Sequence, residues 1–169
     1  SDMIRLLGIR TGHSTEAEII ATELEADLVA IRNLVSGRPK PLTLLVFGRE
    51  PLTLRNVYAS GGIGFLQDML EVAGGNNVFR EIDNENVSQV SSESILSAAP
   101  EIIIEIRYGE TIPRNIVEDE RDVWNQLSTL PAVKNNRIYF VTGNHFVVPG
   151  PRVVQATEEL ARMIHPDAF

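Results

Sequence analysis

Short, strongly apolar runs alternate with amphipathic helical patterns along this chain, and this alternation restricts the fold more than any other feature. Leu42–Phe47, Ile102–Ile106 and Arg137–Val141 have the length of strands and are followed by glycine or polar residues. Apolar runs of this kind are typical of parallel strands that are buried on both faces. Helical patterns recur near residues 61–73, 92–98, 116–128 and 152–164. The order predicts an α/β fold, namely a three-layer α/β/α lobe with a mostly parallel sheet of about four strands.

A long helix is predicted over residues 14–36, ahead of the first strand. Thr15 and Glu18 match the capping-box pattern of a helix start, and Gly37 follows the last apolar position. The apolar positions recur at helical spacing and are Ile20, Leu24, Leu28, Ile31 and Val35. This helix is long for a small domain, so part of its apolar face is expected to lie outside the lobe.

These patterns divide the chain into three segments. Residues 1–13 are interpreted as a tag remnant and a lead-in, in which Gly8 and Gly12 interrupt regular structure. Residues 14–36 form the long helix, and residues 37–169 form the α/β lobe. Because the starting Ser-Asp-Met resembles a tag remnant, the native protein is expected to begin upstream, with its targeting segment there.

Composition excludes several classes of protein. The net charge of −8 argues against a nucleic-acid or anionic-membrane partner and favours a basic protein partner. The chain has no cysteine, so it has neither disulfide nor thiol chemistry. No apolar run approaches the roughly 20 residues of a membrane span, and no signal peptide is present in this sequence.

Side chains near the strand ends carry the candidate binding chemistry. In open parallel sheets, ligands bind at the carboxyl ends of the strands. Arginine offers a fork for carboxylate, phosphate or amide oxygens, and tyrosine offers a flat apolar face with a polar tip. The pattern predicts a wall for a large, flat, oxygen-rich ligand; the alternative is a set of ordinary solvated loop residues. The candidates are Arg49, Tyr58, Ser60, Gly61, Arg107, Tyr108, Asn144, His145 and Phe146.

Motifs for nucleotide binding and catalysis are absent from the sequence. The glycines after Ser60 do not complete the dinucleotide fingerprint, because Gln67 stands at the third glycine position. The three histidines lie far apart, and none has a partner at metal-ligand spacing. No nucleophile, base and orienting group come together. We therefore assign no catalytic residue, no metal site and no intrinsic cofactor, and the chain is not expected to be an enzyme.

Glu93 lies in the first turn of the short helix predicted at residues 92–98. A carboxylate at this position complements the partial positive charge of a helix start. On physical grounds alone, this stabilising role is the preferred interpretation of Glu93.

Four segments resemble the C-terminal lobe of the periplasmic binding proteins that deliver vitamin B12, ferric siderophores and haem to ABC importers. They are residues 59–77 (ASGGIGFLQDMLEVAGGNN), 90–100 (VSSESILSAAP), 124–141 (WNQLSTLPAVKNNRIYFV) and 149–154 (PGPRVV). Their order and spacing match, and the resemblance covers residues 4–166. It implies that the helix at 14–36 is the backbone helix between two lobes, and that the N-terminal lobe is absent from this chain.

The resemblance also implies a function. The chain would belong to an extracytoplasmic or periplasmic component of an ABC importer, which captures a metal chelate (cobalamin, a ferric siderophore or haem) between two lobes and delivers it to the permease. Glu93 would dock onto arginines of the permease, a role that replaces the purely stabilising interpretation. Contact with the membrane would occur only through the permease or an upstream lipid anchor.

The ligand and the class of function stay open at this point. An aromatic residue that often precedes the glutamate motif in B12 binders is not evident, and Val87 stands near that place. Arg49 or Arg107 would suit an anionic siderophore, and Tyr58 or Tyr108 would suit haem. The competing functions are an enzyme on the same α/β scaffold and a ligand-free interaction or signalling module.

Overall fold

An open six-stranded sheet lies at the centre of the computed structural model, which describes residues 1–83, 87–107 and 114–169. The strand order is β4-β2-β1-β5-β6, and β3 pairs with β1 beside that path. The strands are β1 (Leu42–Gly48), β2 (Val57–Ser60), β3 (Asn76–Asn77), β4 (Val87–Val90), β5 (Ile102–Arg107) and β6 (Ile138–Thr142). The three apolar runs of the sequence therefore form β1, β5 and β6.

The centre of the sheet is parallel, as predicted. β1 pairs in parallel with β5, and β5 pairs in parallel with β6. The sequence pattern does not identify β2 and β4, which form an antiparallel edge. Each of these strands has four residues and includes an exposed side chain, Tyr58 or Gln89, so neither forms an apolar run. The predicted number of about four strands is too low, but the α/β class is confirmed.

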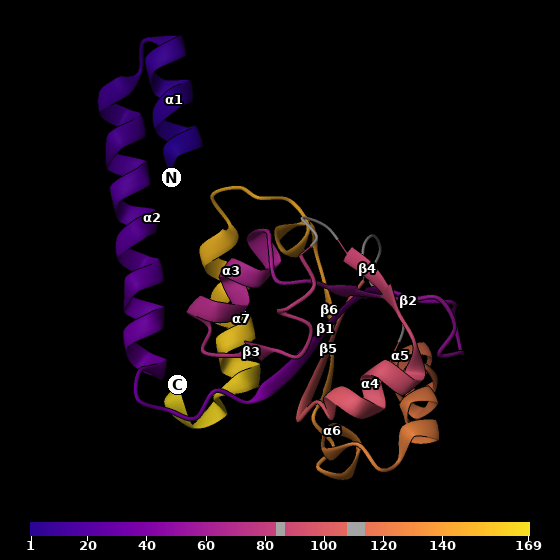
Figure 1. The fold of residues 1–169 in the computed structure, drawn as a ribbon. Helices are drawn as coiled ribbons and strands as arrows, with labels where there is room; N and C mark the ends of the chain where they lie inside the picture. Colours follow the sequence, from indigo (N-terminus) through magenta and orange to yellow (C-terminus); the bar gives the residue numbers. More distant parts are fainter. Residues whose placement is uncertain (84–86, 108–113) are drawn as a thin grey trace.

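Helices cover both faces of the sheet, which confirms the three-layer architecture (Figure 1). The first layer contains α3 (Phe65–Val72), α7 (Val153–Ile164) and the end of α2 (Ser14–Val35). The second contains α4 (Ser92–Ala98), the 3-10 helix η1 (Val123–Leu127) and α6 (Pro131–Lys134). The other helices are α1 (Asp2–Thr11), α5 (Arg114–Asp122), η2 (Asn144–Phe146) and η3 (Pro166–Ala168). None of the helices in the described ranges is both long and apolar enough to cross a membrane.

Alternation along β5 builds a separate hydrophobic core on each face of the sheet. The isoleucines at even positions pack with α3 and α7, whereas Ile103 packs with Trp124 of η1. Successive side chains of a strand point to opposite faces, so Glu105 shares the face of Ile103. Its side chain is fully buried, and a charged group at that position requires partners.

α1 and α2 form a helical hairpin, which corrects the expectation that glycines interrupt the start of the chain. Gly12 adopts a φ of 78° and ends α1 in a left-handed conformation. Gly8 lies inside α1, where an added Cβ would be 2.2 Å from the Cβ of Ala17 on α2. The first glycine therefore permits close helix packing, and the second permits the turn.

The capping-box prediction for α2 is wrong. α2 begins at Ser14 after His13, which makes no side-chain capping bond. Glu18 instead accepts hydrogen bonds from Arg5 of α1 at 2.9 and 3.0 Å. The Glu18 carboxylate therefore pairs with α1, whereas in a capping box it would accept a hydrogen bond from the backbone at the start of α2.

Only part of the apolar face of α2 packs on the lobe, as its length predicts. Ile31 and Val35 belong to the core shared with α3 and α7. Ile20 is 46% exposed, whereas Leu24 is buried and Leu28 is partly buried. Figure 1 shows why: the half of α2 that pairs with α1 extends beyond the lobe.

Candidate functional site

The carboxyl ends of β1, β5 and β6 meet at one edge of the sheet, because these strands run parallel. β2 starts at the same edge, where Tyr58 lies opposite Gly48 at the end of β1. The loop 49–56 and η2 therefore lie on this edge. Ligands of open α/β sheets bind outside the carboxyl ends of the strands, so this edge is the candidate site.

A cavity of about 210 Å³ lies beside this edge. Its lining includes Phe47 from the end of β1, Ser60 from the end of β2 and Val87 from the start of β4. Ile63 before α3 and Val147 after η2 complete a mainly apolar wall to which Ser60 adds a hydroxyl. Such a wall suits the apolar face of a flat ligand that also accepts or donates a hydrogen bond.

Ser60 is among the residues predicted from the sequence, but Phe47, Ile63 and Val147 of the same wall are not. The predicted residues are mostly polar or charged groups at strand ends, whereas most of the wall is apolar. The signal that was present is the position of Phe47, the last residue of the first apolar run, which is 36% exposed.

A second, larger cavity of about 440 Å³ lies between the helical hairpin and the lobe. Met3 and Leu7 of α1 and Leu24 of α2 line it on the hairpin side, and Phe65 and Pro149 line it on the lobe side. Phe65 also lines the smaller cavity, so the two cavities are neighbours. The volume of the larger cavity falls in the range of roughly 300–1,000 Å³ that is typical of ligand sites.

The residues of η2 have three different environments. Asn144 is exposed at the strand edge, while Phe146 is fully buried in the core of the α7 face. His145 Nε2 lies 3.2 Å from Glu159 Oε1 on α7. Phe146 therefore stabilises the lobe, and His145 already has a partner within the protein. Within the described ranges, no group of three or more His, Asp or Glu side chains is placed to hold a metal ion.

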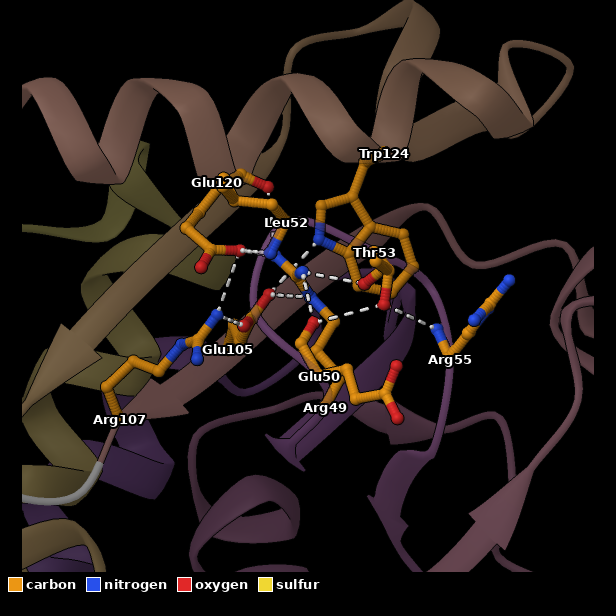
Figure 2. Close-up of polar contacts among 9 residues, drawn as sticks. All are labelled: Arg49, Glu50, Leu52, Thr53, Arg55, Glu105, Arg107, Glu120 and Trp124. Carbon is orange, nitrogen blue, oxygen red and sulfur yellow. Dashed lines mark hydrogen bonds and ion pairs between the residues drawn. The ribbon is translucent and has the colours of Figure 1, made fainter.

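Arg49 lies in a buried network of charges under the loop 49–56 (Figure 2). Its Nε donates to Glu105 Oε2 at 3.1 Å, and its Nη2 pairs with Glu120 Oε2 at 2.7 Å. Its Nη1 donates to the Thr53 carbonyl at 2.8 Å. The Arg49 side chain is fully buried, so the predicted ligand-binding group is directed into the protein.

Trp124 and Arg107 complete this network. The indole Nε1 donates to Glu105 Oε2 at 3.2 Å, and Arg107 pairs with Glu105 and, at 3.3 Å, with Glu120. Burial raises the pKa of Glu105, and the two arginines oppose that shift. The Arg107 side chain is 17% exposed, and its Nε has no hydrogen-bond acceptor among the described residues. Of the two arginines, Arg107 is therefore the more exposed, although its Nε atom is itself buried.

The remaining predicted ligand residues differ in exposure. Tyr58 is 41% exposed on β2. Gly61 is buried, and its carbonyl accepts a hydrogen bond from Asn77 Nδ2 at 2.9 Å. Tyr108 lies outside the described residues. Tyr58 is thus the exposed one of these residues, whereas Ser60, which lines the smaller cavity, is 2% exposed and its hydroxyl donates to the Gly61 carbonyl at 3.3 Å.

Glu93 is exposed in the first turn of α4, as its position in the sequence predicts. Its own backbone N–H, followed by the Ser91 hydroxyl, lowers the pKa of the Glu93 carboxyl. Ser91 caps the helix by accepting from the Ser94 N–H at 3.2 Å. The carboxylate is therefore ionised at neutral pH and reachable by a partner.

Known proteins resemble this chain in both sequence and fold. The family model described as periplasmic binding protein matches residues 1–144. Among curated relatives, the uncharacterized ABC transporter substrate-binding lipoprotein YvrC of Bacillus subtilis (strain 168) is 28% identical over 166 residues, 98% of this chain and 50% of that protein. The vitamin B12-binding protein of Salmonella paratyphi A is 26% identical over 165 residues, 97% of this chain and 55% of that protein.

Two further comparisons concern a haem-uptake protein and a solved structure. The high-affinity heme uptake system protein IsdE of Staphylococcus aureus (strain Newman) is 29% identical over 141 residues, 80% of this chain and 46% of that protein. An ABC transporter substrate-binding protein from Listeria monocytogenes EGD-e has the same fold, with a TM-score of 0.85 and 23% identity over 98% of this chain and 63% of that one.

The chain spans about half the length of the curated relatives it matches. The family model nevertheless covers most of the chain, from residue 1 to residue 144. Its fold, with a parallel sheet centre and helices on both faces, agrees with that assignment. The chain therefore belongs to the periplasmic binding protein family.

Proposed function

We propose that this chain is a ligand-binding lobe of an extracytoplasmic solute-binding protein, which captures a metal chelate and delivers it to an ABC importer. The observation that carries the proposal is the mainly apolar cavity at the carboxyl edge of the sheet, in a chain of this family. Relatives named for vitamin B12 binding and haem uptake support a large, flat chelate as the ligand. Cobalamin, haem and a ferric siderophore are the candidates.

In this proposal, the ligand lies on the wall of the smaller cavity. Ser60 and Tyr58 give polar contacts, and Ile63 and Val87 give apolar ones. Arg107 and Asn144 lie at the ends of the neighbouring strands and meet polar groups of the ligand, while His145 is held by Glu159. Arg49, Gly61 and Phe146 stabilise the fold instead, because Arg49 and Gly61 are hydrogen-bonded inside the lobe and Phe146 packs in its core.

A second lobe, supplied by a longer protein, would close over this wall. The projecting half of α2 supports the idea, since α2 and α1 leave apolar side chains exposed away from the lobe. The backbone helix would then hold the two lobes at a fixed separation. The protein would act outside the cytoplasm and meet the membrane only through the permease or a lipid anchor.

Glu93 is proposed to dock the lobe onto arginines of the permease. Its carboxylate is exposed and its pKa is lowered, so it offers a fixed negative charge. An arginine on the partner would form a charge-assisted pair with it, which is geometrically specific.

The proposal is tested by titrating the protein with cobalamin, haem and a ferric hydroxamate while recording absorbance spectra. One of the three should bind and shift its spectrum. Ile63→Gln should weaken that binding about tenfold, because it places an amide on the apolar wall. Ile116→Gln on α5 is the control, since Ile116 is 42% exposed and Ile63 is 43% exposed.

Two results would contradict the proposal. The first is that neither the chain nor a longer protein that contains it binds any of the three chelates. Alternatively, Ile63→Gln and Ile116→Gln would alter the affinity equally, which would place the site elsewhere.

A further inference from the structure

The loop 49–56 presents an apolar side chain in an unfavourable backbone conformation. Leu52 has a φ of 57°, in the left-handed region, and is 57% exposed. Pro51 precedes it, and the Thr53 N–H donates to the Glu50 carbonyl at 3.3 Å. This is the pattern of a type II turn, whose third position favours glycine or asparagine. The leucine is thus strained, and burial of its side chain does not compensate for the strain.

Buried charges hold this turn in place (Figure 2). The Leu52 N–H donates to Glu120 Oε2 at 3.1 Å, and the same oxygen pairs with Arg49 at 2.7 Å. Arg49 also binds the Thr53 carbonyl. Movement of the turn would break hydrogen bonds to charges that are fully or almost fully buried. Leu52 is therefore a rigid, solvent-facing apolar residue, and a preorganised residue loses little entropy on binding.

The turn lies beside the start of α4, which carries Glu93. Val57, directly after the loop, pairs with Val90, directly before the capping Ser91. Gln89 Nε2 also donates to Asn56 Oδ1 at 2.9 Å. Figure 1 shows the loop after β1 and the start of α4 on the same side of the lobe. Leu52 and Glu93 therefore belong to one surface.

The segments that meet at this surface are rich in exposed carboxylates. They belong to the loop, to α4 and to α5, and they are Glu50, Glu93, Glu118, Asp119 and Asp122, against which the loop also exposes Arg55. α5 contacts the loop directly, through Glu120 and the Leu52 N–H. A partner with basic side chains around an apolar recess would complement such a surface.

We propose that Leu52 is the apolar anchor of the docking surface that carries Glu93. The inference rests on the proposed function, in which the partner is the extracytoplasmic face of an ABC permease. Leu52 enters a recess of the permease, and basic groups around that recess pair with Glu93 and its neighbours. The strained leucine is then explained, because asparagine or glycine would relax the turn but leave the recess empty.

The test uses the full-length protein and its importer in lipid nanodiscs, with binding followed by surface plasmon resonance. Leu52→Asn should weaken binding to the importer about tenfold, while the melting temperature stays unchanged or rises as the strain is relieved. Leu52→Met should retain binding, because it keeps an apolar side chain of similar size. Leu34→Gln, at a 50% exposed leucine on α2, is the control and should leave binding unchanged.

Comparison with Glu93→Gln separates this inference from the proposed function. If Glu93→Gln weakens binding to the importer and Leu52→Asn does not, Leu52 is not an anchor and the proposed function stands. A lower melting temperature for Leu52→Asn would mean that Leu52 is not strained, and the proposal that it is an anchor would fail with that premise. If the unaltered protein does not bind the importer, both the proposed function and the anchor fail.

Discussion

Buried charge is concentrated at one point of the lobe, between β1, β5 and α5. Arg49 and Glu105 are fully buried, and Glu120 is 6% exposed. Charges removed from water persist only where they are paired and hydrogen-bonded. Here the pairing also fixes the backbone of the loop 49–56, since Arg49 and Glu120 bind its carbonyl and N–H groups. The paired charges therefore also fix the backbone conformation of the loop 49–56.

Arg49→Met should lower the free energy of unfolding by about 3–5 kcal/mol, because it leaves Glu105 and Glu120 as buried charges without their main partner. Denaturant unfolding measures the change. Arg55→Met is the control, since Arg55 is exposed on the same loop, and its effect should stay within about 0.5 kcal/mol. A loss of ligand affinity without a loss of stability in Arg49→Met would instead assign Arg49 to ligand binding.

Stability should depend on His165 in mildly acidic solution. Burial lowers the pKa of His165 from 6.5; the Gly74 carbonyl opposes this shift, and Arg38 and Arg137 add to it. Below pH 6.5 the unfolded chain therefore binds more protons than the folded one. The stabilising contribution is complete above that pH and is lost as the pH falls through the folded-state pKa. Unfolding of His165→Gln should lack this part of the pH dependence, whereas His13→Gln, at an exposed position, should keep it.

Glu93→Gln should leave the melting temperature and ligand affinity nearly unchanged, because Glu93 is exposed and does not line the cavity. Stimulation of the importer's ATPase should fall, since the charge-assisted pair with the permease is lost. Thermal melts, ligand titrations and ATPase assays measure these quantities. If the substitution leaves ATPase stimulation intact, Glu93 only stabilises the start of α4.

At the scale of elements, the hairpin of α1 and α2 depends on contacts that propensity does not show. Gly8 has low helix propensity, yet it stands inside α1, because its missing Cβ admits Ala17 of α2. Arg5 adds ion pairs to Glu18 and Glu25 at 2.9 and 2.7 Å. A tertiary contact therefore decides the structure of a segment that appears broken in the sequence.

Gly8→Val should loosen α1 from α2, because the new Cβ would overlap the Cβ of Ala17 and approach the His13 carbonyl oxygen. Overpacking of this kind costs about 1–3 kcal/mol. Faster hydrogen exchange of the α1 amides measures the effect. Gly12→Asn is the control: its site is open, and asparagine tolerates the left-handed conformation. Equal exchange in both variants would mean that the contact at Gly8 does not hold the hairpin.

Elements with strong periodicity could be predicted, and elements that depend on neighbours could not. The apolar runs of β1, β5 and β6 identify their own structure, and so does the spacing along α2. β2 and β4 are four-residue strands without a continuous apolar run, and β2 is held by pairing with β1 and β4 and by burial of Val57 and Ala59. The helix predicted near 116–128 divides into α5 and η1, because Trp124 reaches inward to Glu105. The residues around Trp124 in the sequence do not indicate this contact, because Glu105 lies 19 residues away.

The same limit applies to the candidate site. Position at a strand end predicts an edge of the sheet as the site, and Tyr58 is 41% exposed at that edge. It does not reveal that Arg49 points into the network or that Phe146 belongs to the core, since side-chain direction depends on the packing of distant segments. The mainly apolar cavity wall arises from five separate segments and has no motif of its own.

At the scale of the whole molecule, the proposed site is one wall of a cleft. Half of a cleft supplies only part of the contacts, and each 1.4 kcal/mol of lost interaction weakens affinity about tenfold. The apolar residues exposed on α1 and α2 form a surface of the kind that a second body covers. The lobe alone should therefore bind its chelate weakly.

Calorimetric titration of this chain, beside a two-lobed protein that contains it, tests the central claim most directly. The chelate identified by the absorbance titrations is added to both. The two-lobed protein should bind it at least about a hundredfold more tightly, because its second lobe completes the contacts and excludes water. Equal affinities, or no chelate binding by the two-lobed protein, would contradict a site shared between lobes.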